Sequence, residues 1–272
     1  MRDSVLIATP AYGGLLHSKY VMSMVGTCRE LARLGIQHGL FILPNDSLVS
    51  RDRNRCDAFA LQHGFGSMVF VDADLGWTLD DFMAILMSDK PVIGGTYPIK
   101  QAEDPRLVYN PCEHDCIPAG VRPRSLEELR YLDEHCADRE TGELQVRHVP
   151  TGFLKIDRAV LKKLRNHVPS YQQERLEGTG WETHHDFFPV RVSGNMYESE
   201  DWAFCTLVRQ HLDCGVWLNT RVVLNHTGTF TYTAQPATPA DPVQPPIEIG
   251  LPRSQASAAS TSGKPGWLTV SA

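Results

Sequence analysis

Residues 68–74 read Met68-Val69-Phe70-Val71-Asp72-Ala73-Asp74, an apolar run that ends in two carboxylates one residue apart. A short apolar run of this composition is typical of a buried strand. Side chains two apart on an extended chain point the same way, so Asp72 and Asp74 can approach one divalent ion. Carboxylate oxygens suit Mg²⁺ and Mn²⁺. The stretch predicts a strand with a metal site at its carboxyl end, and the alternative is an ordinary solvated Asp pair.

Strand and helix signals alternate on both sides of this stretch. Thr78 and Asp81 form a capping box, with Asp in place of the usual Glu or Gln, at the start of one expected helix. The expected strands are residues 5–8, 40–43, 68–71 and 92–95, and the expected helices are residues 21–34, 50–63 and 78–87. The alternation predicts an α/β fold with a mostly parallel sheet. In such sheets, ligands bind at the carboxyl ends of the strands.

The rest of the chain is less regular. Residues 101–147 are irregular and polar, and they form an insert with one helical piece. The expected later elements are a helix over residues 125–136, strand signals over 146–156, helices over 157–167 and 199–212, and strands over 216–218 and 222–224. Residues 233–272 hold seven of the 18 prolines and show no apolar periodicity. We expect one domain over residues 1–232 and a flexible tail over residues 233–272.

Composition excludes several classes of protein. The chain has 26 basic and 32 acidic side chains and a net charge of −6, which argues against a globally basic, nucleic-acid-binding surface. A local basic groove stays open, formed by Arg122, Arg124, Arg130 and Arg147. The apolar runs are far shorter than the roughly 18 residues of a membrane span. Met1-Arg2-Asp3-Ser4 lead directly into a strand-like run, so we expect no signal peptide.

The seven cysteines are an odd number scattered along the chain, which indicates reduced thiols and a cytoplasmic protein. Cys112 and Cys116 flank Glu113-His114-Asp115, but the spacing is not that of a zinc finger. We favour loop thiols over a zinc site.

The common phosphate-binding and hydrolase motifs are absent. No P-loop is present, and Thr9-Pro10-Ala11-Tyr12-Gly13-Gly14 after the first expected strand is not a dinucleotide-binding Gly-x-Gly-x-x-Gly. A Gly-x-Ser-x-Gly elbow and a His-Glu-x-x-His pair are also missing. These absences leave the Asp-x-Asp as the sharpest chemical feature.

The order and spacing of the local motifs resemble those of GT-A-fold, family-2-like glycosyltransferases, of the compact type often found in bacteriophage genomes. The resemblance covers roughly residues 4–232 and rests on the following strings: Thr9-Pro10-x-Tyr12-Gly13-Gly14, Ser47-Leu48-x-x-Arg51-x-Arg53-Asn54, Phe70-Val71-Asp72-Ala73-Asp74-Leu75-Gly76, Val92-Ile93-Gly94-Gly95-x-Tyr97-Pro98-x-Lys100, Thr151-Gly152-Phe153-Leu154-x-Ile156, Ser199-Glu200-Asp201-Trp202-x-Phe204-Cys205 and Leu224-Asn225-His226-x-Gly228-Thr229. It implies a Rossmann-like GT-A fold of three layers.

The resemblance also implies a donor site. Asp72 and Asp74 would hold Mn²⁺ or Mg²⁺ on the diphosphate of a nucleotide-sugar, with a UDP-sugar as the expected donor. His226 would be a third metal ligand. The remaining donor-site residues would be Thr9, Pro10 and Tyr12 along the nucleoside, Arg53 and Asn54 beside the nucleotide, and Lys100 at a phosphate or at the acceptor. Arg51 and Arg55 would share a solvated helix face.

Glu200 and Asp201 match an acidic pair at the start of a late helix. Asp201 would be the general base that takes the proton from an acceptor hydroxyl in an inverting transfer. The helix N-terminus would depress a carboxylate's pKa there and keep it ionised. On the acceptor side the resemblance implies Thr151, Gly152 and Trp202.

Two features depart from the family pattern. Residues 101–147 have no counterpart, and Cys205-Thr206-Leu207-Val208-Arg209 stands where an Arg-Arg pair is expected. The stereochemistry of transfer therefore stays open. For the paired histidines, His184-His185-Asp186, an acceptor-loop role or none is expected.

The identity of the acceptor and the class of function both stay open. A hydroxymethyl-pyrimidine in phage DNA and a surface saccharide are the two candidate acceptors. The alternatives to a glycosyltransferase are a nucleotidyltransferase and a non-catalytic nucleotide- or sugar-binding module. A nucleotidyltransferase would need a basic residue in the loop after the first strand, and Ala11-Tyr12-Gly13-Gly14 of this chain has none.

Overall fold

The computed structural model describes residues 4–44, 46–101, 106–112, 117, 120–176 and 178–228. These residues belong to the first of the two units into which the chain divides, Met1–Thr229. The helices are η1 (Tyr12–Gly14), α1 (Ser18–Arg33), α2 (Val49–His63), α3 (Leu79–Met87), α4 (Leu126–His135), α5 (Arg158–Leu164) and α6 (Glu200–His211). The strands are β1 (Ser4–Ala11), β2 (Gln37–Pro44), β3 (Ser67–Val71), β4 (Leu75–Gly76), β5 (Val92–Thr96), β6 (Asn110–Pro111), β7 (Glu143–His148), β8 (Phe153–Asp157), β9 (Ser170–Glu174), β10 (Trp181–His185), β11 (Arg191–Ser193), β12 (Met196–Glu198), β13 (Val216–Val223) and β14 (Asn225–His226).

The central sheet of the described residues has eight strands in the order β2-β1-β3-β8-β5-β13-β7-β6. β2, β1 and β3 pair in parallel, as do β5 and β13, whereas β8 and β7 run against their neighbours. Six strands therefore share one direction and two oppose it. The prediction of an α/β fold with a mostly parallel sheet is confirmed.

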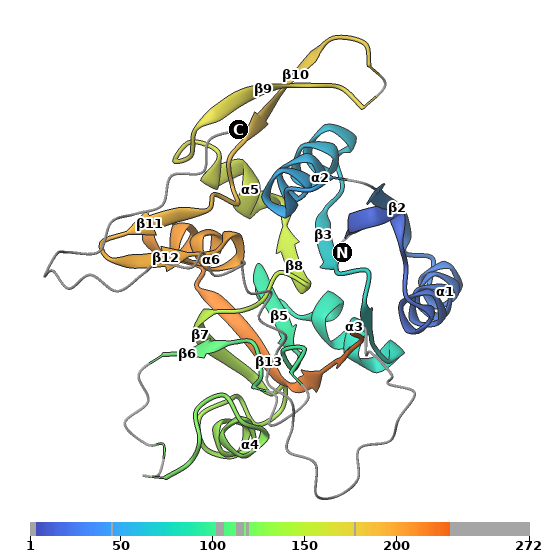
Figure 1. The fold of residues 1–272 in the computed structure, drawn as a ribbon. Helices are drawn as coiled ribbons and strands as arrows, with labels where there is room; N and C mark the ends of the chain where they lie inside the picture. Colours follow the sequence, from blue (N-terminus) through green and yellow to red (C-terminus); the bar gives the residue numbers. More distant parts are fainter. Residues whose placement is uncertain are drawn as a thin grey trace, which may run out of the picture. The chain divides into compact units, whose positions relative to one another are not determined.

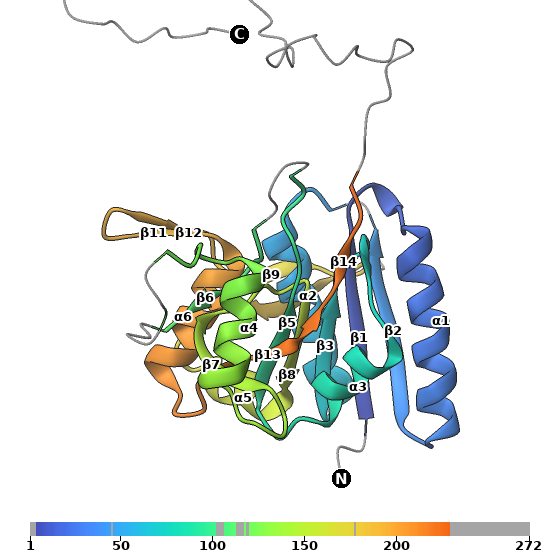
Figure 2. The same cartoon turned by 90° about the horizontal axis from the view of Figure 1, so that it is seen from below.

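Helices cover both faces of this sheet, which makes three layers (Figures 1 and 2). Apolar side chains of α1 and α3, such as Met24 and Phe82, pack on one face. The other core contains side chains of α2, α5 and α6, such as Ala60, Leu161 and Phe204, together with two leucines of α4. Burial of apolar surface on both faces is the main stabilising contribution to such a fold.

The helix starts follow from the local sequence. Thr78 accepts a hydrogen bond from the Asp81 N–H at 3.1 Å, and Asp81 Oδ2 accepts one from the Thr78 N–H at 2.8 Å, so the expected capping box is confirmed. Ser125 caps α4 in the same way through the Glu128 N–H. Both helices begin where these side chains satisfy otherwise unpaired N–H groups.

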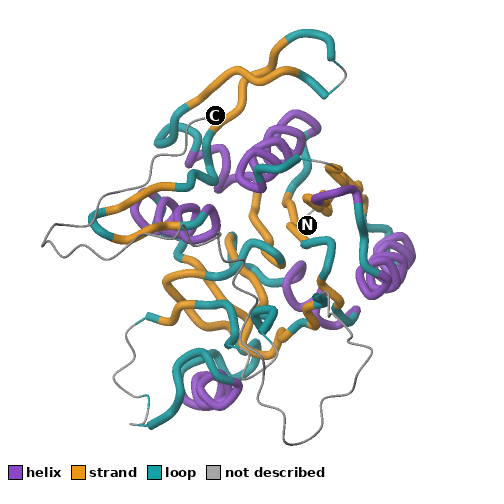
Figure 3. The backbone as a smooth tube through the Cα atoms, viewed as in Figure 1, coloured by secondary structure: helices purple, strands orange, loops and turns teal. Residues whose placement is uncertain are grey.

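Other expectations differ from the structure. The polar loop after α5 holds two antiparallel hairpins, β9–β10 and β11–β12, which lie next to α2 and α6 respectively (Figure 3). The two expected strands near residue 220 are one bulged strand, β13. The predicted tail over residues 233–272 and Cys116 of the alternative zinc site lie outside the described residues. In the described part of the chain, no helix is long and apolar enough to cross a membrane.

Candidate active site

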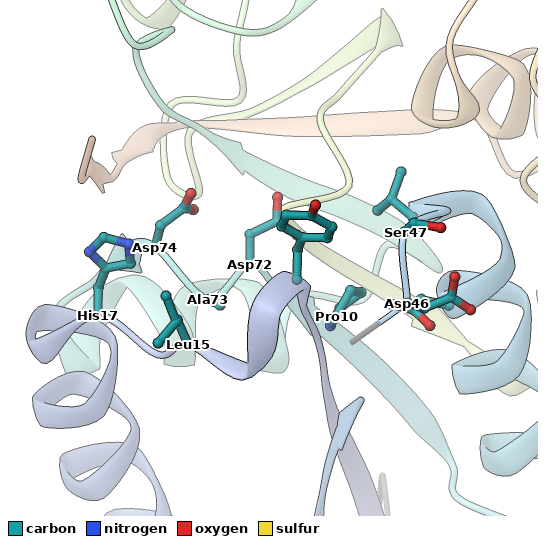
Figure 4. Close-up of a pocket in the computed structure, with 11 residues that line it drawn as sticks. Pro10, Leu15, His17, Asp46, Ser47, Asp72, Ala73 and Asp74 are labelled. Atoms are coloured by element: carbon teal, nitrogen blue, oxygen red, sulfur yellow. The ribbon is translucent and has the colours of Figure 1, made fainter. Parts of the chain in front are cut away.

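A pocket of about 410 Å³ lies where β1, β2 and β3 end, as expected for the carboxyl edge of a parallel sheet. The short helix η1 follows β1 directly and carries Tyr12, which is 79% exposed. Figure 4 shows the lining side chains: Pro10, Tyr12, Leu15, His17, Asp46, Ser47, Val49, Asp52, Asp72, Ala73 and Asp74. An exposed ring above a pocket that holds four carboxylates is suited to a ligand with an aromatic part and cationic or metal-bound groups.

Asp72 is the first residue after β3, and its position is fixed by the neighbouring antiparallel strand. Its N–H donates to the Gly152 carbonyl at 2.8 Å. A Cβ on Gly152 would overlap both the Tyr97 hydroxyl and the Asp72 carboxylate, so only glycine fits there. The sequence reasoning selected Gly152 for the acceptor side, and the structure gives it a packing role beside Asp72.

Asp74 lies between two basic side chains. Lys100 donates to Asp74 Oδ2, and His226 Nε2 lies 3.5 Å from Asp74 Oδ1. His226 is brought there because β14 pairs with β4, which begins directly after Asp74. Burial on its own would raise the pKa of Asp74, but the hydrogen bonds from His226 and Lys100 outweigh it and lower the pKa to about 2. Asp74 is therefore a carboxylate throughout the neutral range.

Arg53 connects two acidic parts of the site from inside helix α2. Its side chain is only 3% exposed, with Nη2 3.1 Å from Asp72 Oδ1 and Nε 3.5 Å from Glu200 Oε1. The guanidinium also stacks over the Phe70 ring, 5.2 Å from the centroid. Burial opposes its charge, but Asp72 and Glu200 raise its pKa, so Arg53 stays cationic. Among the described residues, its Nε and Nη1 have no hydrogen-bond partner, which leaves it donor capacity.

Asp201 lies in the first turn of α6. Its Oδ1 accepts hydrogen bonds from the Ser199 hydroxyl and, at 2.8 Å, from the Trp202 N–H. Burial and the adjacent Glu200 raise the pKa of Asp201, although the Ser199 hydrogen bond opposes them. The expectation that the helix N-terminus depresses this pKa is therefore wrong, because desolvation and a like charge outweigh the helix. A carboxylate with a raised pKa is a stronger base.

The donor set at Asp74 suits a divalent cation. His226 Nδ1 must donate its proton to the Pro98 carbonyl at 2.7 Å, since that oxygen can only accept. Nε2 is then the nitrogen that faces Asp74, and it is also the nitrogen with which such a histidine would bind a metal ion. Asp72 is turned to Arg53 instead. In the described part of the chain, no three His, Cys, Asp or Glu side chains converge on a metal site.

Several predicted residues do not line the pocket. Thr9 is fully buried, and its hydroxyl bonds to the Tyr20 hydroxyl at 2.7 Å. The Asn54 amide bonds to Asp186 and to the N–H groups of Phe187 and Phe188, so it ties α2 to the segment after β10. Thr151 is buried, and Trp202 stacks on His148 with the ring centroids 4.6 Å apart. Of the two arginines expected on a solvated face, Arg51 is paired with Asp46, and Arg55 bonds to the Glu174 carbonyl.

Two carboxylates of the pocket were missed by sequence reasoning. Asp46 forms a two-pronged ion pair with Arg51, with both N–O distances 2.6 Å, and this lowers its pKa. Asp52 is 2% exposed, and burial together with Asp46 raises its pKa to about 7. The only sequence signal was Asn45-Asp46 shortly after the strand expected over residues 40–43, on the same side of the sheet as Asp72 after the next strand.

No family model matches the chain, and no curated protein matches it. Among solved structures, the chain is similar to the crystal structure of A197 from STIV, with 14% identity and a TM-score of 0.41 over 88% of this chain and 100% of that one. It is also similar to the crystal structure of GalNAc-T7 with UDP, GalNAc and Mn²⁺, with 8% identity and a TM-score of 0.42. That alignment covers 83% of this chain and 44% of the other.

Proposed function

We propose that the chain is a metal-dependent glycosyltransferase of the GT-A, family-2-like type, which moves a sugar from a UDP-sugar to a hydroxyl acceptor. The observation that carries this proposal is one arrangement of charges. Asp74 and His226 present two ligands beside the pocket under Tyr12. Arg53 connects Asp72 at the pocket wall to the helix start that carries Asp201. A donor site and a base are thereby joined through one buried cation.

The donor would bind with its nucleoside in the pocket, where Tyr12 stacks on the base and Pro10 forms the floor. Asp74 and His226 would hold the cation, which supplies positive charge to the departing diphosphate. Lys100 and Arg53 are the protein's own cations on the same side. Both lie within contact of the Asp-x-Asp carboxylates, at Asp74 and Asp72 respectively.

Asp201 would take the acceptor proton on Oδ2. Its other oxygen already accepts two hydrogen bonds, from Ser199 and from the Trp202 N–H, and these hold the carboxylate in one orientation. As the acceptor oxygen attacks the anomeric carbon, the proton moves to Oδ2 and the diphosphate leaves from the opposite face. A single displacement of this kind inverts the anomeric configuration. Glu200 is held by Arg53 and would keep that cation oriented.

The acceptor stays a choice between a saccharide and a hydroxymethyl-pyrimidine in DNA. The test is a screen of nucleotide-sugars with the full chain and Mn²⁺, measuring released nucleoside diphosphate, followed by mass spectrometry of glycans and hydroxymethylated DNA. We expect turnover of a UDP-sugar that stops when EDTA is added. Release of pyrophosphate from a nucleoside triphosphate would favour a nucleotidyltransferase instead, and metal-independent binding without turnover would favour a non-catalytic module.

A further inference from the structure

Lys100 occupies one oxygen of the carboxylate that would hold the metal ion in the proposed site. Its ammonium bonds to Asp74 Oδ2, and His226 Nε2 faces the other oxygen of the same carboxylate. Both Asp74 oxygens therefore face nitrogen groups of the protein. An ammonium on one oxygen of a carboxylate and a divalent cation on the other repel each other, because both are positive and lie only a few ångströms apart.

The Lys100 side chain is partly exposed. Its exposed fraction is 44%, and its stem lies beside Gly228, which has no side chain. Lysine is a compact charge on a flexible four-carbon stem, so it exchanges partners more readily than a two-pronged arginine. By contrast, Arg53 at the neighbouring Asp72 is almost completely buried, so its position is fixed.

The two metal ligands do not depend on Lys100 for their position. His226 is held by the Pro98 carbonyl at 2.7 Å and by the pairing of β14 with β4. The Asp74 carbonyl accepts the Thr227 N–H at 2.9 Å, which fixes the Asp74 backbone beside the same strand pair. Removal of the Lys100 ammonium therefore leaves an intact pair of oxygen and nitrogen ligands.

We propose that Lys100 competes with the divalent cation for Asp74 and moves to the donor diphosphate when metal and donor enter together. This inference rests on the proposed function of the same site. It makes Lys100 the residue that couples binding of the metal ion to binding of the donor. The metal alone must displace the ammonium with nothing to receive it, whereas a bound diphosphate offers the ammonium a new anionic partner.

The coupling is reciprocal, as binding equilibria require. UDP strengthens the binding of Mn²⁺, and Mn²⁺ strengthens the binding of UDP by the same factor. Loss of the Lys100 charge removes much of this coupling. In Lys100→Met, the site binds Mn²⁺ more tightly without UDP, and the further gain on adding UDP is smaller than in the wild type.

The experiment is a titration of Mn²⁺ into the full chain, with free Mn²⁺ followed by electron paramagnetic resonance, with and without UDP. The variants are Lys100→Met, the charge-retaining Lys100→Arg, and Lys90→Met as a matched control far from this pocket. Without UDP, we expect Lys100→Met to bind Mn²⁺ at least about ten-fold more tightly than wild type, which corresponds to about 1.4 kcal/mol. Lys100→Arg and Lys90→Met should stay within about two-fold of wild type.

Unchanged or weaker Mn²⁺ binding by Lys100→Met without UDP overturns the inference. The proposed function fails separately, if the wild type binds no UDP with Mn²⁺ present, whatever Lys100→Met does to the metal affinity. Absence of Mn²⁺ binding in the wild type and in all variants overturns both.

Discussion

Two pockets of this molecule differ in size and in how their charges are arranged. The pocket at the carboxyl ends of β1, β2 and β3 measures about 410 Å³, whereas a second pocket near the amino ends of β5 and β13 measures about 880 Å³. In the larger pocket, Lys90 lies 3.2 Å from Asp89, 3.7 Å from Glu143 and 4.6 Å from the centroid of the Trp217 ring. Its one lysine is therefore already surrounded by partners.

The smaller pocket holds carboxyl groups whose pKa values are shifted in opposite directions. Burial raises the pKa of Asp52 to about 7, whereas Asp74, despite burial, has its pKa lowered to about 2 by His226 and Lys100. Carboxyl groups whose environments push their pKa values apart cluster at functional sites. The comparison teaches that the volume of a cavity is a weaker indicator of function than the charged groups held at its wall.

The largest expected effect comes from Asp201, whose neighbour Glu200 is connected through Arg53 to Asp72 of the smaller pocket. Asp201→Asn cannot accept the proton from the acceptor hydroxyl, so transfer should slow by about 10²–10⁴-fold. UDP affinity with Mn²⁺ should stay unchanged, because Asp201 does not line the pocket. Steady-state kinetics with the donor and acceptor found in the screen, together with calorimetry, measure both quantities.

Asp138→Asn is the matched control for this prediction, since Asp138 is an acidic residue at the wall of the larger pocket. Its transfer rate should equal that of the wild type. Wild-type turnover by Asp201→Asn would remove Asp201 from the role of base, and equal losses in both variants would indicate a general effect on the fold.

A smaller effect is expected for the buried carboxyl of the pocket wall. The folded chain holds the proton of Asp52 up to about pH 7, whereas the unfolded chain loses it near pH 4. The folded state then binds more protons across this window, so its stability falls as the pH rises from about 4 to 7 and is constant above. Asp52→Asn removes this slope. The difference in free energy of unfolding between Asp52→Asn and wild type should therefore favour the variant by about 2–4 kcal/mol more at pH 8 than at pH 4.

Denaturant unfolding of both proteins between pH 4 and 8 measures the Asp52 prediction. Parallel curves for wild type and Asp52→Asn would show that Asp52 titrates equally in the folded and unfolded chains. A difference that kept growing above pH 7 would place its folded pKa higher than about 7.

The smallest expected effect is at the larger pocket. Lys90→Met should leave the UDP affinity unchanged and lower the free energy of unfolding by no more than about 1 kcal/mol, because a partly exposed ion pair and a cation–π contact each contribute little. Calorimetry and denaturant unfolding check the two values. Loss of UDP binding in Lys90→Met would reverse the comparison and move the nucleotide site to the larger pocket.

Local patterns predicted much of the fold. The order of the strands depends on pairing between residues far apart in the sequence, which local patterns do not encode. The apolar run before Asp72 and the capping box of α3 are set by neighbours in sequence, and both are confirmed. The insertion of β8 between β3 and β5 depends on contacts between residues sixty or more positions apart. On α1, Val21 and Val25 are apolar but exposed, because Tyr20 and Thr27 face the core instead.

The site shows the same division. Proximity of Asp74 to its strand end followed from the sequence, whereas its contact with Lys100 and His226 depends on loops that meet only in the fold. The family resemblance suggested a ligand role for Thr9 and Asn54, whereas in the structure hydrogen bonds to other parts of the chain engage both side chains. Asp52 was missed because its shifted pKa arises from burial beside Asp46, which no local motif encodes.

The most direct measurement is a calorimetric titration of UDP into the full chain, once with Mn²⁺ and once with EDTA, for wild type and Asp74→Asn. We expect one UDP per chain, bound at least about ten-fold more tightly with Mn²⁺, and loss of this gain in Asp74→Asn. Equal UDP binding with EDTA and with Mn²⁺, or a full Mn²⁺ effect in Asp74→Asn, would contradict the assignment of the smaller pocket as a metal-dependent nucleotide-sugar site.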